Sequence, residues 1–247
     1  MTKKPNILFF FTDDQRFDTI NALGNDKIKT PNLDQLVECG TSFTRAHIPG
    51  GTHGAVCMPS RAMLHTGRSL FHLQNSGAQI PENHVMLGEA LQKAGYQTFG
   101  TGKWHNGTSS YARSFTDGGE IMFGGMGDHW NVQACDFDPS GEYEPTKVIE
   151  APFSDNTVEK RLCDHINCGK HSSELFCKTA GDWLRNYDSD DPFFTYISFM
   201  APHDPRSMPE KFLNMYDPED IELPESFQKE HFNFGVREIR DEVLADY

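Results

Sequence analysis

Basic residues are scarce in this chain of 247 residues, which has 22 Lys and Arg against 36 Asp and Glu. The resulting net charge of −14 excludes the broad basic face with which nucleic-acid-binding proteins contact phosphates. An anionic substrate would have to be bound by a few local cations, against the field of the whole chain. We therefore expect no nucleic-acid partner.

Long apolar runs are also missing, since no stretch approaches the ~20 apolar residues of a transmembrane helix. The apolar run Ile7–Phe11 is shorter than the apolar region of a signal peptide and leads directly into Thr12, Asp13 and Asp14. We interpret it as a buried first strand. We accordingly expect no membrane partner, and a chain that is either cytoplasmic or, if a leader has been removed, periplasmic or secreted.

The six cysteines are too few for a disulfide scaffold in a chain of this length. The spacing of Cys163, Cys168, His171 and Cys177 does not match the close pairs of a zinc site, so we disfavour zinc there. A disulfide between two of these cysteines would require an oxidising compartment. With 37% hydrophobic residues, including 19 Phe, the chain can bury a core without such cross-links.

Strand-like and helix-like segments alternate along the chain. The apolar patterns predict strands at 6–11, 41–47, 96–99 and 193–200, and helices at 31–37, 59–67, 85–94, 172–187 and 236–247. Residues 105–170 are rich in Gly, Asp and Pro and are expected to be mostly loop. This alternation predicts an α/β fold with a mainly parallel, mixed central sheet flanked by helices. The uninterrupted apolar run at 6–11 predicts a central strand buried on both faces.

Polar side chains follow three of the predicted strands. Asp13 and Asp14 follow the first strand, Lys103 and His105 come after the strand at 96–99, and His203 follows the last. The carboxyl ends of parallel strands share one edge of a sheet, which is where ligands bind in α/β proteins. We therefore expect these side chains to converge.

Cys57 lies just before a predicted helix that has Pro59 in its first turn. A helix N-terminus lowers the pKa of a thiol and binds anions, and Arg61 adds positive charge one turn later. The residues alone leave two interpretations open. Cys57 is either a reactive cysteine beside an anion site or a buried cysteine at a turn that proline initiates.

The sequence CMPSR at 57–61, followed by LHTGR at 64–68, resembles the C-x-P-S-R and L-x-T-G-R signature of the type I sulfatases. These enzymes are the formylglycine-dependent branch of the alkaline phosphatase superfamily. The resemblance implies that a maturation enzyme oxidises Cys57 to formylglycine, an aldehyde that hydrates to a diol. One hydroxyl would attack sulfur and expel the alcohol. Deprotonation of the other would then eject sulfate, a release step that a serine lacks.

The same resemblance assigns a metal site to Asp13, Asp14 and the converted Cys57. Oxygen ligands select a hard cation, so Ca²⁺ is expected, with Mg²⁺ as the alternative. Taken alone, two adjacent aspartates are also common at turns and helix caps, and that interpretation stays open on the residues themselves.

The resemblance further implies catalytic roles for four residues besides Cys57. Arg61 would hold the formylglycine and its anion, and Lys103 would neutralise the sulfate oxygens. His105 would contact the diol and accept the proton whose loss triggers sulfate release. His203 would bind sulfate and protonate the leaving oxygen. Without the other matches, GKWH at 102–105 would be typical of a surface lysine and a packed tryptophan.

The resemblance covers nearly all of the chain but only the N-terminal half, or somewhat more, of a typical sulfatase. We therefore interpret residues 1–247 as the N-terminal part of a single catalytic domain, with the C-terminal part of the family fold absent. The chain is then a fragment, is completed by a second chain or segment, or is truncated and inactive. We expect little activity from this chain alone, and an exposed sheet edge with apolar surface beside it.

The expected function is that of a sulfuric ester hydrolase, which releases inorganic sulfate from a sulfated carbohydrate or a small sulfate ester. One alternative is a phosphonate or phosphodiester hydrolase of the same superfamily, since some of these share C-x-P-S-R. Another is an inactive sulfatase-like protein that binds sulfated glycans.

Overall fold

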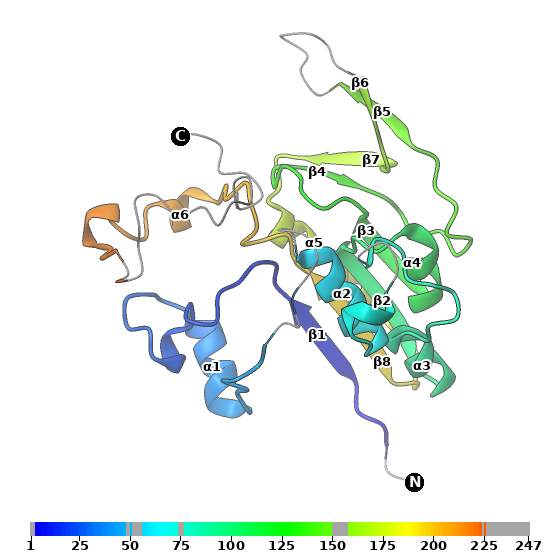
Figure 1. The fold of residues 1–247 in the computed structure, drawn as a ribbon, viewed down its shortest axis with the longest axis horizontal. Coiled ribbons are helices and arrows are strands. Elements are labelled where there is room, and N and C mark those ends of the chain that lie inside the picture. The colour runs from blue at the N-terminus through cyan, green and yellow to red at the C-terminus, as the bar shows by residue number, and fades with distance from the viewer. Residues whose placement is uncertain are drawn as a thin grey trace.

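The computed structural model describes residues 3–47, 50, 56–73, 77–149, 158–223 and 225. Its centre is a sheet of four parallel strands with helices on both faces (Figure 1). The strands run in the order β1 (Ile7–Phe11), β8 (Phe193–Ser198), β2 (Gln97–Lys103) and β3 (Asp117–Met122). The predicted α/β fold with a parallel central sheet is therefore confirmed.

One face of the sheet is covered by α5 (Ser172–Asn186), which lies against β2, β8 and β3. Leu175 and Phe176 of this helix are buried against Phe99 of β2 and Ile197 of β8. Successive strand residues point to opposite faces, so this face takes alternate residues of each strand.

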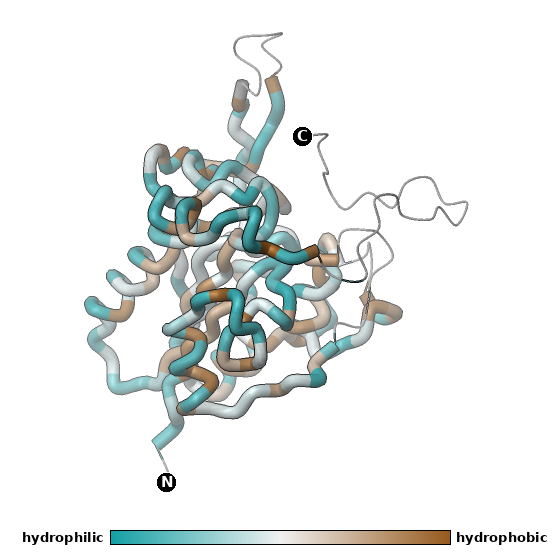
Figure 2. Tube along the Cα trace, turned by 90° about the vertical axis from the view of Figure 1, so that its left-hand side faces the viewer, coloured by the Kyte–Doolittle hydropathy of each residue, from teal (hydrophilic) through white to brown (hydrophobic). Residues whose placement is uncertain are grey.

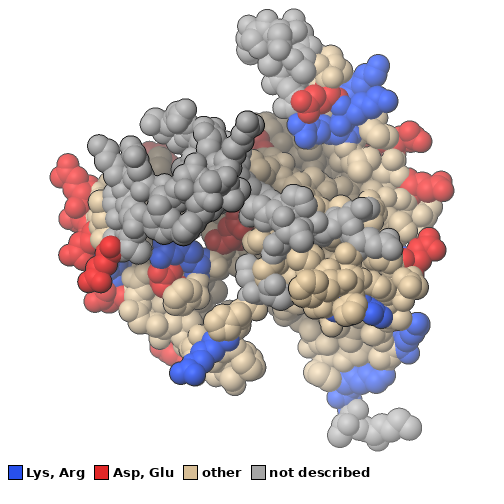
Figure 3. Space-filling view, in the orientation of Figure 1, with Lys and Arg blue, Asp and Glu red and all other residues tan. Residues whose placement is uncertain are grey.

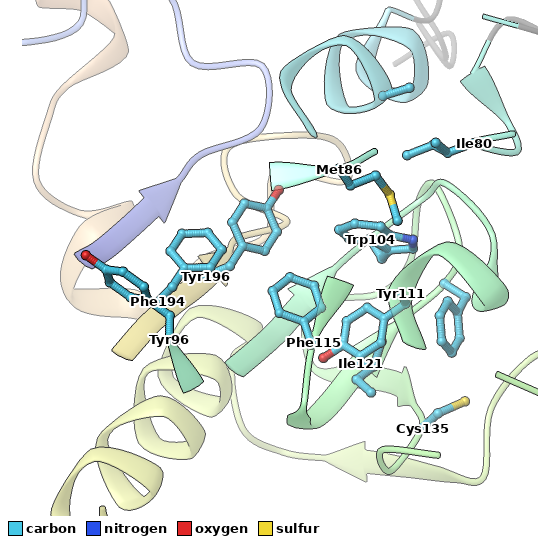
Figure 4. Close-up of a cluster of buried hydrophobic side chains, with 12 residues drawn as sticks. Ile80, Met86, Tyr96, Trp104, Tyr111, Phe115, Ile121, Cys135, Phe194 and Tyr196 are labelled. Carbon is cyan, nitrogen blue, oxygen red and sulfur yellow. The ribbon is translucent and has the colours of Figure 1, made fainter. Parts of the chain in front are cut away.

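The other face carries α2 (Cys57–Thr66), α3 (Leu87–Lys93) and α4 (Thr108–Ser114). Figure 4 shows the cluster of aromatic side chains that these helices cover. Trp104 is its centre: the rings of Tyr111 and Phe115 meet it edge-on at 5.5 and 5.6 Å. Its indole N–H donates to the Gly107 carbonyl at 2.7 Å, which satisfies the buried polar end of the side chain.

Short elements make up the rest of the described chain. They are the 3₁₀ helices Asn21–Leu23, Leu70–His72 and Pro218–Asp220, the helices α1 (Pro31–Cys39) and α6 (Glu210–Leu213), and two antiparallel strand pairs, β4 (Asn131–Ala134) with β7 (His165–Cys168) and β5 (Thr146–Ile149) with β6 (Val158–Arg161). The region 105–170, which was expected to be mostly loop, contains α4 and the short strands β3 to β7 between its loops.

The prediction that the first strand is central and buried on both faces is also wrong. In the described sheet β1 is an edge strand, and Leu8 and Phe10 are 48% and 51% exposed because α5 lies against the other three strands. An exposed sheet edge with apolar surface beside it was expected, and β1 provides it. Figure 2 shows hydrophobic residues on outer segments of the trace as well as in the interior.

Smaller corrections concern residues at the ends of elements. Residues 41–47 form no strand and are exposed, since they pair with no strand of the described chain. Cys57 is the first residue of its helix rather than the residue before it. The N-cap of α5 is His171, which precedes the predicted helix, and its Nδ1 accepts the backbone N–H of Ser173. The helix predicted at 236–247 lies outside the described residues.

Candidate active site

The carboxyl ends of β1, β8 and β2 meet at one edge of the sheet, as the sequence predicts. Ser198, the last residue of β8, is in register with Phe11 of β1 and with Gly102 of β2. Beyond this edge, the backbone N–H of Asp13 donates to the Ala201 carbonyl at 3.1 Å. The segments that follow β1 and β8 are therefore fixed to each other.

Asp13 lies among buried cations at this edge. It is only 4% exposed, and its Oδ2 lies 2.5 Å from Lys103 Nζ and 3.4 Å from Arg61 Nη2. Both cationic side chains are themselves almost fully buried. The charged side chains on the face in Figure 3 lie mostly around its periphery, so this internal charge cluster contrasts with the distribution on that surface.

Arg61 is held in the first turns of α2 by acceptors on two strands. Its Nη1 donates to the Lys103 carbonyl and to Ser198 Oγ, each at 2.6 Å, and its guanidinium lies 5.0 Å from the centre of the Phe11 ring. Its Nε meets no hydrogen-bond acceptor among the described residues. Ser198 was not predicted as a site residue, because the only signal in the sequence is a polar residue at the end of an apolar strand.

Cys57 stands at the N-terminus of α2 and is 7% exposed. Its Sγ lies 3.4 Å from His105 Nδ1, and its side chain also hydrogen-bonds to His203. His203 Nε2 in turn lies 3.6 Å from Asp14 Oδ2. The seven residues that the sequence singled out for the site therefore lie in two groups of contacts at this edge of the sheet, one of Asp13, Arg61 and Lys103 and the other of Asp14, Cys57, His105 and His203.

The two histidines beside Cys57 have opposite pKa shifts. Burial, reinforced by the positive charges of Lys103 and Arg61, lowers the pKa of His105 to about 4. The hydrogen bond that the protonated ring donates to the Cys57 side chain, with a smaller contribution from the Asp204 carbonyl, raises the pKa of His203 to about 9. At neutral pH, His105 is a neutral acceptor and His203 a charged donor, a division that suits a base and an acid.

Unusual backbone conformations also gather here. Asp14 and His105 have φ angles of +59° and +66°, which residues other than glycine rarely adopt. Gly102 has a φ of +87°, and a Cβ there would lie 1.9 Å from the Ser198 carbonyl oxygen, so only glycine fits. Such conformations are concentrated at functional sites.

The donor set suits part of a calcium shell. Asp13 and Asp14 offer carboxylate oxygens, which hard cations prefer, but fewer of them than the ~6–8 ligands that Ca²⁺ takes. The sulfur of Cys57 is a soft ligand and fits such an ion only after conversion to an oxygen-bearing group. The side chain of Asp14 is 47% exposed, and its Oδ2 lies 3.6 Å from His203 Nε2.

Another group of ligand-type side chains lies away from this edge. The ligand atoms of Asp136, Asp164 and His165 lie within 4.8 Å of one another, and the two aspartates are exposed. The described residues form no such group from Cys163, Cys168, His171 and Cys177, for which zinc was disfavoured. All six cysteines are free thiols.

The family model described as Sulfatase matches residues 5–238. This chain belongs to the sulfatase family. The family is part of the alkaline phosphatase superfamily, and the resemblance identified on residues 57–68 is thus confirmed.

Relatives and solved structures agree with this membership. The sulfatase chain is 30% identical over 225 residues to the ulvan-active sulfatase of Formosa agariphila, a match that covers 89% of this chain and 40% of the relative. It is 26% identical to human N-acetylgalactosamine-6-sulfatase, over 97% of this chain and 45% of that enzyme. It superposes on Ps i-CgsB in complex with k-i-k-neocarrahexaose with a TM-score of 0.64, at 24% identity, over 89% of this chain and 50% of that structure.

The sulfatase chain thus spans less than half the length of these two curated relatives. Among its described helices, none has the length and apolar character needed to cross a membrane.

Proposed function

We propose that the site around Cys57 hydrolyses sulfate esters and releases inorganic sulfate. The observation that carries this proposal is the charge balance beside Cys57. Lys103 and Arg61 are both buried and share a single buried carboxylate, that of Asp13. Burying a cation without compensation is costly, so this excess of positive charge favours a bound anion such as a sulfate group.

In this proposal Cys57 is matured to formylglycine by a separate maturation enzyme. The hydrated aldehyde would supply the attacking oxygen together with the second hydroxyl that allows release of sulfate. Asp13 and Asp14, with an oxygen of the converted residue 57, would hold a Ca²⁺ ion, with Mg²⁺ as the alternative. Such an ion supplies Lewis-acid stabilisation of developing negative charge.

The surrounding side chains supply charge and proton transfer. Lys103 would neutralise the sulfate oxygens, and Arg61 would hold the nucleophile and its anion. His203, whose side chain contacts residue 57, is suited to donate a proton to the leaving oxygen. His105, neutral and 3.4 Å from Sγ of residue 57, is suited to take the proton that triggers release.

We infer a sulfated carbohydrate as the substrate class. The support is that an ulvan-active sulfatase and an N-acetylgalactosamine-6-sulfatase match most of this chain. For the domain organisation, we propose that residues 1–247 are the N-terminal part of a single sulfatase catalytic domain. The match of one family model across residues 5–238 supports that arrangement.

The test uses the intact protein, coexpressed with a maturation enzyme. We expect a peptide containing residue 57 to have the mass of formylglycine, and we expect Cys57→Ser to abolish release of sulfate from an aryl sulfate. Cys39→Ser is the matched control, because Cys39 is exposed, and it should retain activity. An unmodified thiol at residue 57 in a fully active enzyme would overturn the proposal.

The same assay separates the alternatives. Faster turnover of an aryl phosphodiester than of an aryl sulfate would favour a phosphonate or phosphodiester hydrolase. Binding of sulfated glycans without turnover, in protein shown to carry formylglycine, would favour an inactive sulfatase-like binding protein.

A further inference from the structure

The segment 201–207, which carries His203, leaves the end of β8 without regular secondary structure. Its first part is tied to the sheet edge, since the backbone N–H of Asp13 donates to the Ala201 carbonyl and that of His203 to the Met200 carbonyl. A catalytic side chain on such a segment needs further support, because small displacements of a reacting group are costly in rate.

His129 contacts this segment from a buried position. Its Nε2 lies 3.3 Å from the His203 carbonyl oxygen and its Nδ1 lies 2.7 Å from Ser172 Oγ. A carbonyl oxygen only accepts hydrogen bonds, so Nε2 must carry the proton. In the neutral ring Nδ1 then accepts the hydroxyl of Ser172. Burial lowers the pKa of His129, which favours this neutral form.

His171 makes the corresponding contact further along the segment. Its Nδ1 accepts the backbone N–H of Ser173 at 3.3 Å, as the N-cap of α5. A backbone N–H only donates, so the proton of the neutral ring is on Nε2, which donates to the Ser207 carbonyl at 3.1 Å. The rings of His129 and His171 are stacked, with centres 5.0 Å apart and planes 15° apart.

We propose that His129 and His171 form a pair of positioning residues that hold segment 201–207 by two carbonyls and thereby orient His203. The pair joins this segment to the N-terminus of α5, which is packed on the sheet. Each ring reaches the segment at a backbone carbonyl, that of His203 for His129 and that of Ser207 for His171, so both act through the backbone. The inference rests on the proposed catalytic role of His203.

A purely structural role in packing is the competing explanation, and two substitutions at residue 129 separate it from positioning. The side-chain nitrogen of Gln lies near the place of imidazole Nε2, so His129→Gln retains a donor to the His203 carbonyl. The side-chain nitrogen of Asn lies near the place of Nδ1, so His129→Asn loses that donor and keeps a polar group near Ser172. Both variants replace a buried ring by an amide.

In the intact, matured protein we expect His129→Gln to stay within about threefold of the parent kcat. Loss of one hydrogen bond corresponds to about tenfold in rate, so His129→Asn should lower kcat about tenfold with little change in KM. In a His203→Ala background the two variants should be equally active. Equal kcat values for His129→Gln and His129→Asn with His203 present, at equal folded fraction, would overturn the proposal.

Nitrogen-15 spectra of the imidazoles give a readout that does not depend on activity. We expect the proton on Nε2 in both His129 and His171, and a shift of the His203 side-chain signals in His129→Asn but not in His129→Gln. A proton on Nδ1 of either ring would overturn the proposed contacts. If the parent hydrolyses no sulfate ester but the spectra are as expected, the proposed function fails while the positioning of residue 203 stands.

Discussion

Lys103 Nζ and Asp13 Oδ2 lie 2.5 Å apart, and both side chains are almost completely buried. Arg61 brings a second buried cation to the same carboxylate oxygen, at 3.4 Å. The arrangement couples β2, α2 and the segment after β1 through a single acidic group. The loss of protein stability on substitution therefore depends on which of the three charges is removed.

Removal of Asp13 should cost more stability than removal of Lys103. Lys103→Met leaves Asp13 paired with Arg61, whereas Asp13→Asn leaves two buried cations without a carboxylate. Breaking a buried pair costs about 3–5 kcal/mol, so we expect Lys103→Met near the lower end and Asp13→Asn at or above the upper end. Urea unfolding of the intact protein in the presence of a chelator measures both values.

Lys178→Met is the matched control for this experiment. Lys178 pairs with Asp182 on the exposed surface of α5, where solvent screens the pair, so its removal should change stability little. A loss for Lys103→Met no larger than that for Lys178→Met would contradict the interpretation of a buried charge cluster.

Asp14 should be needed for the response to calcium rather than for folding. Its side chain is half-exposed, so Asp14→Asn should have a near-parental melting temperature in a chelator. Addition of Ca²⁺ should raise the melting temperature of the intact parent, because a ligand that binds only the native state stabilises it, and should raise that of Asp14→Asn much less. Mg²⁺ and a sodium salt of equal ionic strength are the comparisons. Equal stabilisation of both proteins by Ca²⁺ would remove Asp14 from the metal site.

Gly102→Ala should be among the most damaging single substitutions in the chain. Residue 102 combines a positive φ with a Cβ position 1.9 Å from a backbone oxygen, so the strand β2 would have to move. We expect a loss of about 3 kcal/mol or more, or no soluble protein. Gly124→Ala is the control, because the nearest atom to a Cβ there lies at an ordinary contact distance of 3.5 Å. Similar melting temperatures for the two variants would contradict the steric argument.

The sequence predicted the parts of the site that are encoded in contiguous motifs. Cys57 and Arg61 lie on one helix, and Asp13, Lys103 and His203 lie at or just beyond the ends of strands, which meet wherever a sheet is parallel. A local pattern together with that single topological assumption was sufficient to bring these residues together.

The features that the sequence did not predict depend on contacts between distant segments. Ser198, His129 and His171 gained their partners only through the fold, and nothing beside them in the sequence distinguishes them from packing residues. The apolar run at 7–11 fits equally well in a central or an edge strand, because a run does not show what covers its second face. The strands β4 to β7 are too short for a detectable pattern, and β4 pairs with β7, a segment far from it in the sequence.

His65 should make the stability of the protein fall as the pH falls below 6.5. Its ring is fully buried between Trp104 and Tyr196, and neither ring nitrogen has a hydrogen-bond partner among the described residues. Burial, with the charge of Arg61, lowers the pKa of His65 to about 3, so the folded chain holds it neutral while the unfolded chain takes up a proton near the ordinary value of 6.5.

The sign of the effect follows from proton uptake. Between pH 6.5 and about 3 the unfolded state binds one proton more at this residue, so the free energy of unfolding decreases as the pH falls, in total by several kcal/mol. Replacement by leucine, which has a similar volume and does not titrate, should flatten this part of the dependence. The measurement is urea unfolding of parent and His65→Leu at pH 7 and pH 5, with His47→Leu, at an exposed position, as the control. Equal losses of stability in parent and His65→Leu on going to pH 5 would show that the acid sensitivity arises elsewhere.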